Sequence, residues 1–235
     1  MSTSDLTERQ LAAMIDHTAL KPQTQESHIL RLCKEARTYG FGAICIAPTW
    51  VEVAKRELVG TEVKIASVVG FPHGNTLPQV KALEAERAMQ LGATEFDMVI
   101  NIGALKDRNE KVVTADIEAV VKVAQTNSGL VKVIIEAALL TEAEKQLACR
   151  LAKKAGADFV KTSTGFAGEG KGATVEDVRL MRASVGGMLG VKAAGGIKDC
   201  ETALSMTEAG ATRLGCSSSV QILEQFRSCH CPESG

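Results

Sequence analysis

The sequence has almost no net charge. Its 235 residues include 27 lysines and arginines against 28 aspartates and glutamates, which gives a formal net charge of -1 at pH 7. A protein that binds nucleic acid needs a strongly basic face to neutralise phosphates. The balanced charge therefore argues against a nucleic-acid partner and favours small molecules as ligands.

Long apolar runs are also missing. No stretch approaches the roughly 20 apolar residues that cross a bilayer, and residues 1–10 are polar rather than arranged as a signal sequence. We therefore expect a cytoplasmic protein with no membrane partner. The seven cysteines lack the spacing of metal ligands, apart from Cys229-His230-Cys231, so reduced thiols are expected. Because no second cysteine or histidine cluster accompanies that segment, we expect no metal ion.

A dinucleotide-binding turn is the third absence. No Gly-x-Gly-x-x-Gly segment follows the first predicted strand, which disfavours a doubly wound sheet. Short apolar strands and helical segments instead alternate eight times. This alternation predicts parallel pairing, right-handed crossovers and closure into a single α/β domain, a (β/α)8 TIM barrel. With 45% hydrophobic residues, the chain can bury the core that such a domain needs.

The single domain is expected to span residues 1–235. A short helix over 6–14 precedes the barrel, and residues from about 227 to 235 are expected to form a flexible tail. Strands are predicted at 15–22, 43–46, 63–69, 95–100, 131–135, 159–160, 190–193 and 213–214, and helices at 25–39, 51–58, 77–91, 105–124, 141–155, 175–183, 199–209 and 218–226.

Charged residues stand among apolar neighbours in or beside three of the predicted strands. These residues are Asp97, Lys161 and Lys192. TIM barrels build their sites at the carboxyl ends of the strands. Because these strands are packed on both faces, a charged side chain within one of them is expected to point into the barrel interior. The simpler alternative is structural: a lysine whose ammonium reaches solvent, or a buried ion pair.

Two lysines beside one aspartate would favour Schiff-base chemistry. A buried lysine loses its charge readily, and a second ammonium nearby lowers the pKa of the first, which supplies the neutral amine that condenses with a carbonyl compound. The aspartate would offset part of the charge and transfer protons. The spacing leaves open whether Lys161 or Lys192 is the nucleophile.

Glycine-containing loops follow the last two predicted strands. Gly195-Gly196 and the segment from Gly215 to Ser219 offer backbone amides and hydroxyls, the second ahead of a helix N-terminus. Loops of this kind bind phosphate in TIM barrels, so we expect a phosphorylated substrate. The alternative is that the glycines only form tight turns and the serines only cap the helix.

Five segments resemble the deoxyribose-phosphate aldolases of the lysine-dependent class, class I. The resemblance covers nearly the whole chain with the motifs in the same order, and the segment after Phe226 departs from it. The motifs are Ile15-Asp16-His17-Thr18, Glu95-Phe96-Asp97-Met98-Val99-Ile100-Asn101, Val160-Lys161-Thr162-Ser163-Thr164-Gly165-Phe166, Val191-Lys192-Ala193-Ala194-Gly195-Gly196-Ile197 and Gly215-Cys216-Ser217-Ser218.

This resemblance implies a reaction and a set of residues. The family cleaves 2-deoxy-D-ribose 5-phosphate reversibly to D-glyceraldehyde 3-phosphate and acetaldehyde, in deoxyribose phosphate catabolism and without a metal or cofactor. Lys161 would form the Schiff base, and Asp97 and Lys192 would act as proton donor and acceptor. The implied substrate-binding residues are Asp16, Cys45, Thr164, Gly165, Gly195, Gly196, Gly215, Ser217 and Ser218.

Two other functions remain open at this stage. A transaldolase-like barrel would also form a Schiff base but would act on a different sugar phosphate, and would use acetaldehyde poorly. A catalytically silent barrel would bind a phosphorylated metabolite through its lysines and would still bind it after Lys161→Met. Homodimer and homotetramer both remain open, because barrels often associate through their outer helices.

Overall fold

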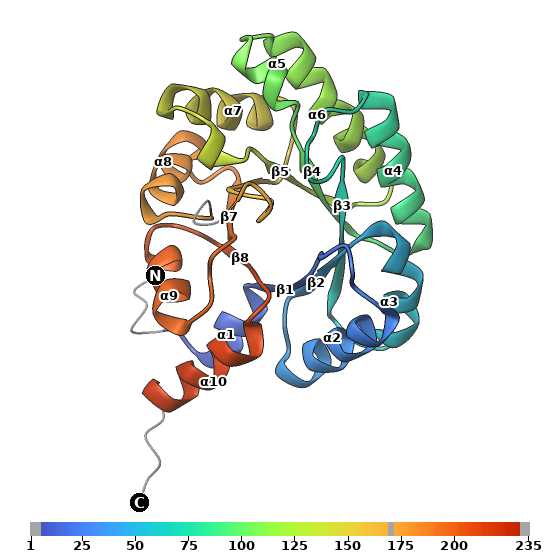
Figure 1. The fold of residues 1–235 in the computed structure, drawn as a ribbon, viewed down its shortest axis with the longest axis vertical. Helices are drawn as coiled ribbons and strands as arrows, with labels where there is room; N and C mark the ends of the chain where they lie inside the picture. The colour runs from blue at the N-terminus through green and yellow to red at the C-terminus, as the bar shows by residue number, and fades with distance from the viewer. Residues whose placement is uncertain (1–5, 169–171, 231–235) are drawn as a thin grey trace, which may run out of the picture.

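Residues 6–168 and 172–230 are described by a computed structural model, whose sheet closes into a barrel (Figure 1). Eight parallel strands pair in chain order, and the last pairs with the first, so the predicted (β/α)8 barrel is confirmed. The strands are β1 Ile15–Ala19, β2 Ala43–Ile46, β3 Lys64–Val69, β4 Glu95–Val99, β5 Leu130–Ile134, β6 Phe159–Lys161, β7 Gly190–Ala194 and β8 Arg213–Cys216.

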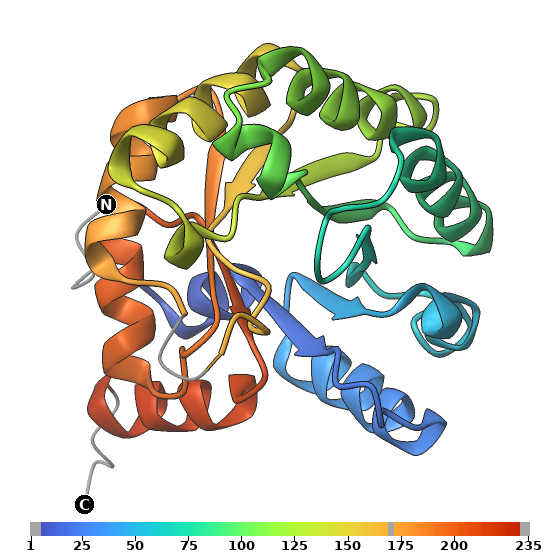
Figure 2. The same cartoon turned by 45° about the horizontal axis from the view of Figure 1, so that its top comes forward.

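Helices surround the barrel on the outside (Figures 1 and 2). The expected short N-terminal helix is present, and the capping box between Thr7 and Gln10 begins it. No helix in the described ranges is long and apolar enough to cross a membrane. The helices are α1 Glu8–Ala13, α2 Glu26–Tyr39, η2 Pro48–Trp50, α3 Val51–Glu57, α4 Pro78–Leu91, α5 Ile102–Lys106, α6 Glu110–Gln125, η3 Ala137–Leu139, α7 Glu142–Lys154, α8 Val175–Val185, α9 Cys200–Glu208 and α10 Ser219–His230.

The prediction of a single helix over 105–124 is wrong, because two helices, α5 and α6, occupy this region. Arg108 has a left-handed backbone with φ of 56°, which ends α5, and the Asn109 side chain accepts a hydrogen bond from the Val112 amide to begin α6. The chain expected to be a tail from residue 227 begins as helix instead: α10 runs to His230, and Arg227 pairs with Glu8. Residues 231–235 of that tail lie outside the described residues.

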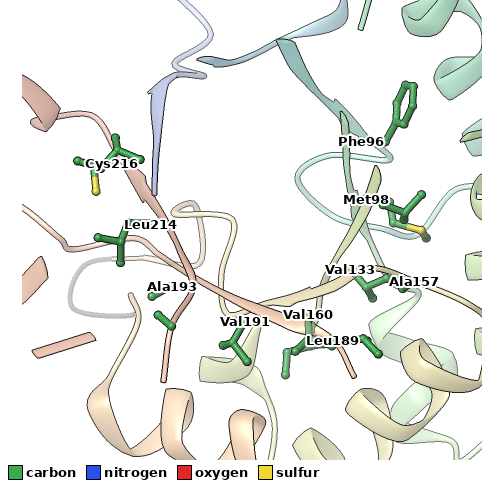
Figure 3. Packing of buried hydrophobic residues seen from close by; sticks show 14 of the residues in the cluster. Phe96, Met98, Val133, Ala157, Val160, Leu189, Val191, Ala193, Leu214 and Cys216 are labelled. Atoms are coloured by element: carbon green, nitrogen blue, oxygen red, sulfur yellow. The ribbon is translucent and has the colours of Figure 1, made fainter. Parts of the chain in front are cut away.

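The main apolar core lies between the strands and the helices, and we call this layer the outer shell. Alternation along each strand sends every second side chain into it. On β4, for example, Phe96 and Met98 are fully buried there, and Figure 3 shows them together with buried residues of other strands, such as Val133 of β5 and Val191 of β7. The helices thereby cover the barrel with close-packed aliphatic and aromatic groups.

The barrel interior is different. A small apolar cluster, formed by Cys45, Ala66 and Val68 with Leu20 and Phe71 packed against it, occupies the side of β2 and β3. Charged side chains from the other strands fill much of the remainder, and they are described below.

A buried ion pair outside the barrel fixes the carboxyl end of β4. Lys81 of α4 contacts Asp116 of α6 at 2.6 Å and donates to the Val99 carbonyl at 2.7 Å, while Asp116 also accepts from the Asn101 amide at 3.1 Å. Both charged side chains are at most 1% exposed. Since β4 carries Asp97 two residues earlier, this pair helps to hold that residue in register.

Candidate active site

A cavity of about 710 Å³ lies at the carboxyl ends of the strands. Its walls come from the residues that end or follow β1, β6, β7 and β8, together with one face of α2. This is the end of the barrel at which the sequence predicted the site.

Asp97 collects three buried lysines beneath this cavity. Its Oδ1 accepts from Lys132 at 2.9 Å, and its Oδ2 accepts from Lys161 and from Lys192, each at 2.7 Å. Asp97 and the three lysines are at most 2% exposed. The three residues predicted from the strand ends are therefore brought together, and Lys132 joins them.

Three further charged residues complete the group. Asp16 contacts Lys192 in a short ion pair and lies 3.2 Å from both Lys132 Nζ and Arg213 Nε. Glu95 contacts Lys132 and Arg213, each at 2.6 Å. We call the seven residues the charged centre: Asp16, Glu95, Asp97, Lys132, Lys161, Lys192 and Arg213.

Strand geometry explains why these charges meet. The register places Asp97 opposite Lys132, and Lys161 opposite Lys192, on adjacent parallel strands. Neighbours across parallel strands point to the same face, so each pair enters the barrel together. The flanking apolar residues, such as Phe96 and Met98 beside Asp97, point the other way into the outer shell.

Electrostatics fix the protonation of two members. Burial alone would raise the pKa of Asp97, but Lys132, Lys161 and Lys192 outweigh it and hold that pKa well below its usual range. At Lys192 burial lowers the pKa, yet Asp16 and Asp97 outweigh burial and raise it. Asp97 is thus a carboxylate and Lys192 an ammonium at neutral pH. The lysine–lysine repulsion stressed by the sequence argument is smaller at Lys192 than the attraction of the carboxylates.

Lys161 differs from the other two lysines of the charged centre. It lines the cavity, whereas Lys132 and Lys192, both in the described part of the chain, do not. Among the ion pairs between described residues, Lys161 contacts one carboxylate, Lys132 three and Lys192 two. A bound molecule can therefore reach the Lys161 amine, which is held by the fewest ion pairs.

The loop after β6 is anchored by Glu136, a residue that the sequence argument did not single out. Glu136 is buried with a left-handed φ of 52°, and its two carboxylate oxygens accept from the Thr164 amide at 3.2 Å, while its Oε2 also contacts the Thr164 hydroxyl. Thr164 and Gly165, two of the residues expected to bind substrate, line the cavity, and Gly165 has φ of 85°.

The glycine loops after β7 and β8 also reach the cavity. Gly195 and Gly196 both have positive φ, near 86° and 80°, and line the cavity together with Gly215 and Ser217. Ser218 follows Ser217 directly and is half-buried, but it is not among the lining residues. Four of the five residues assigned to phosphate binding therefore surround one space.

Cys45 and Asp16 lie deeper than expected for direct substrate contacts. Both are completely buried and neither lines the cavity. The Cys45 sulfur is 3.7 Å from Asp97 Oδ2, and burial raises the pKa of this thiol. Of the terminal Cys229-His230-Cys231 segment, Cys229 is an exposed free thiol and Cys231 lies outside the described residues. The described residues include no group of three or more acidic, histidine or cysteine side chains able to hold a metal ion.

Sequence reasoning missed Lys132, Glu95, Arg213 and Glu136. Lys132 stands between Val131 and Val133, which is the same pattern that singled out Lys192, so its signal was present in the sequence. Glu95 and Arg213 are the first residues of their predicted strands, and Glu136 comes just after one. No local pattern there distinguishes a buried charge from a solvated one.

Comparison with known proteins gives a consistent result. Residues 10–224 match the model of the family described as DeoC/LacD family aldolase. The chain is 57% identical over 216 residues to deoxyribose-phosphate aldolase 1 of Bacillus licheniformis, covering 92% of this chain and 96% of the relative. It is 56% identical over 214 residues to the deoxyribose-phosphate aldolase of Bacillus subtilis, covering 91% and 95%.

A solved structure agrees with the sequence matches. The tetrameric deoxyribose phosphate aldolase of Aeropyrum pernix superimposes with a TM-score of 0.85 at 34% identity, covering 95% of this chain and 93% of that one. The match therefore extends over nearly the whole length of both chains.

Proposed function

The chain belongs to the DeoC/LacD family of aldolases, and on that basis we propose that it cleaves 2-deoxy-D-ribose 5-phosphate reversibly to D-glyceraldehyde 3-phosphate and acetaldehyde. The reaction would proceed through a Schiff base on Lys161. One observation carries the proposal: a buried lysine lines a cavity whose other walls include the glycine loops suited to a phosphate. The reaction would serve the breakdown of deoxyribose phosphates.

The ion pairs of the centre favour Lys161 over Lys132 and Lys192 as the nucleophile. The centre sets four cationic groups, Lys132, Lys161, Lys192 and Arg213, against the three carboxylates of Asp16, Glu95 and Asp97. Among the three lysines of the described charged centre, Lys161 makes the fewest ion pairs and is the one that lines the cavity, so its amine is the one a substrate would meet.

The chemistry follows from that amine. Neutral Lys161 attacks the aldehyde carbon of the substrate, and loss of water gives an iminium ion. Removal of the proton from the C3 hydroxyl breaks the C2–C3 bond and sends its electron pair into the iminium, which becomes an enamine as D-glyceraldehyde 3-phosphate leaves. Protonation of the enamine carbon and hydrolysis release acetaldehyde and restore Lys161.

Asp97 and Lys192 would carry the protons, through a water. In the free enzyme the lowered pKa of Asp97 leaves it a carboxylate and the raised pKa of Lys192 leaves it an ammonium, so Asp97 would be able to accept a proton and Lys192 to donate one. Asp97 contacts Lys161 directly, and Lys192 contacts Asp97. The iminium supplies the electron sink, so the proposed mechanism uses no metal or cofactor.

The proposed phosphate site comprises Gly195, Gly196, Gly215, Ser217 and Ser218. Backbone amides of these loops and the N-terminus of α10 would face the phosphate. Thr164 and Gly165 would contact the sugar. Asp16 would act within the charged centre, and Cys45 beside Asp97, rather than by contact with the substrate, because both are fully buried away from the cavity.

Borohydride trapping with acetaldehyde tests the mechanism directly. Reduction converts an iminium into a stable two-carbon adduct, which mass spectrometry of the digested protein locates. A single adduct on Lys161, absent from Lys161→Met and present in Lys192→Met, is the expected result. An adduct on Lys192 would reverse the roles of the two lysines. No adduct in wild-type protein that still binds a sugar phosphate would favour the silent binder.

The choice of donor substrate distinguishes a transaldolase-like activity from the proposed one. The proposed enzyme condenses acetaldehyde with D-glyceraldehyde 3-phosphate, whereas a transaldolase-like enzyme would use acetaldehyde poorly. Condensation assays that vary the donor aldehyde or ketone at a fixed acceptor distinguish the two.

Assembly and location are part of the same proposal. The relative from Aeropyrum pernix is tetrameric, and we propose a homodimer or homotetramer for this chain, which light scattering after size exclusion would measure. A cytoplasmic location fits the five buried free cysteines. Cell fractionation checks it.

A further inference from the structure

His17 is a buried titratable residue that the proposed mechanism does not use. It stands between Asp16 and Thr18 on β1, so alternation turns its ring away from the charged centre, and it is 4% exposed. Its partner across the β1–β8 pairing is Cys216, the residue just before Ser217 and Ser218. A histidine thus lies directly behind one of the two proposed phosphate-binding loops.

Both ring nitrogens of His17 are engaged. Nδ1 is 2.9 Å from the Ser219 hydroxyl, and Nε2 is 2.7 Å from Glu35 Oε2 on α2. The ring of Phe41 packs against the imidazole at a centroid distance of 4.9 Å. The imidazole is therefore held from three sides and joins β1, α2 and α10.

Ser219 connects this arrangement to the phosphate loop. It is the first residue of α10, is completely buried, and its hydroxyl lies 3.0 Å from the Cys216 carbonyl. That contact closes the turn that contains Ser217 and Ser218. The position of Ser219 consequently sets where the turn and the first amides of α10 lie.

Hydrogen counting assigns the roles. The carboxylate of Glu35 can only accept, so it takes the Nε2 hydrogen and leaves Nδ1 of a neutral ring as an acceptor for the Ser219 hydroxyl. Burial lowers the pKa of His17, and the hydrogen bond to Glu35 offsets only part of that. The ring is thus neutral at pH 7, and the hydrogen of the Ser219 hydroxyl has two acceptors within reach, Nδ1 of His17 and the Cys216 carbonyl.

We propose that His17 is a positioning residue for phosphate binding, which holds Ser219 and thereby the turn between β8 and α10 in the conformation that receives the phosphate. This inference rests on the proposed function for the identity of the substrate. His17 and Glu35 both border the cavity, but the two ring nitrogens of His17 are already engaged by Ser219 and Glu35, so the imidazole is assigned no hydrogen bond to the sugar. It acts through Ser219, with Glu35 fixing the tautomer of its ring.

The test compares a phosphorylated with a non-phosphorylated substrate. Losing one hydrogen bond of ordinary strength lowers affinity by about tenfold. His17→Phe is therefore expected to raise KM for 2-deoxy-D-ribose 5-phosphate by about that factor with kcat little changed, and to leave kcat/KM for 2-deoxy-D-ribose unaltered. Equal losses on both substrates would overturn the proposal, because a general structural defect does not depend on the phosphate.

Two further variants sharpen this test. His17→Asn keeps a hydrogen-bonding group near the place of Nδ1, so its KM for 2-deoxy-D-ribose 5-phosphate is expected to return most of the way to the wild-type value. Ser219→Ala is expected to raise that KM as His17→Phe does, and adding His17→Phe to Ser219→Ala is expected to raise it little further. Full additivity of the two substitutions would overturn the link through Ser219. Both variants serve if His17→Phe does not fold.

Phe96→Ala is the matched control, since it weakens the outer shell on another strand and should affect both substrates alike. Calorimetric titration with inorganic phosphate separates failure of this inference from failure of the proposed function. Wild-type protein that binds phosphate more tightly than His17→Phe supports the positioning role even if no sugar phosphate is cleaved. Equal phosphate affinity in the two proteins overturns it even if cleavage is observed.

Discussion

The outer shell and the charged centre are built from the same strands and have opposite chemistry. On β4, Phe96 and Met98 enter the shell while Asp97 enters the centre, and on β7 Val191 and Ala193 flank Lys192 in the same way. The shell stabilises through apolar area removed from water, which depends little on direction. The centre holds buried charges that are tolerable only with partners at bonding distance. Neighbouring residues therefore differ in whether they carry stability or chemistry.

The largest expected effect comes from removing the amine that faces the cavity. Lys161→Met should lower kcat for cleavage by between about 10⁴ and 10⁶-fold, the range seen when a member of a covalent catalytic unit is removed. Its folded structure should persist, since methionine fills a similar volume. Steady-state assays together with circular dichroism measure both. Activity retained within tenfold of wild type would contradict the assignment of the nucleophile.

Asp97→Asn comes next, because it keeps the shape of the centre and removes its central negative charge. Loss of a positioned proton acceptor should lower kcat by about 10²- to 10⁴-fold. The three lysines would lose a shared counter-charge, so the protein should also unfold more easily. Measurement of kcat on the folded fraction separates the two effects. An unchanged kcat would remove Asp97 from proton transfer.

Phe96→Ala, one residue away, should show the opposite behaviour. The ring is completely buried in the outer shell, so its truncation should lower the free energy of unfolding by about 3 to 5 kcal/mol. The kcat of the remaining folded protein should equal that of wild type. Urea unfolding and assays of the same samples make the comparison. A large loss of kcat here would show that shell and centre are not separable.

The smallest expected effect is a pH dependence of folding stability that comes from Asp16 in the charged centre. Burial raises the pKa of Asp16, but Lys132, Lys192 and Arg213 outweigh it and lower it from 3.8 to about 2. A carboxylate with a depressed folded pKa stabilises the protein above the unfolded value, and this contribution is lost as pH falls through the folded value. It amounts to on the order of 2 kcal/mol.

Unfolding experiments over a series of pH values check this sign. The stability difference between wild type and Asp16→Asn should shrink as the pH falls below about 4, where the native carboxylate begins to lose its advantage. The difference between wild type and Phe96→Ala should stay constant over the same range, because no titrating group is involved. Parallel curves for both variants would contradict the assigned ionisation of Asp16.

Much of the barrel could be predicted from local patterns. Alternating strands and amphipathic helices gave the eight units, and apolar neighbours on both sides marked Asp97, Lys161 and Lys192 as inward-facing. The break between α5 and α6 was missed because it depends on the left-handed backbone of one residue, Arg108, inside an otherwise helical pattern.

The sequence by itself determined the barrel and marked three of the charges that enter it, Asp97, Lys161 and Lys192, because strand alternation and apolar flanks act over a few residues. Tertiary structure alone decided which of these charges form ion pairs with one another. Among the described residues it paired Lys132 with three carboxylates and Lys161 with one, placed Lys161 at the cavity, and set the protonation of Asp97 and Lys192. It also joined His17 to Ser219, 202 residues away. Ion pairing and pKa depend on distance and burial, and these exist only once distant strands have closed into a barrel.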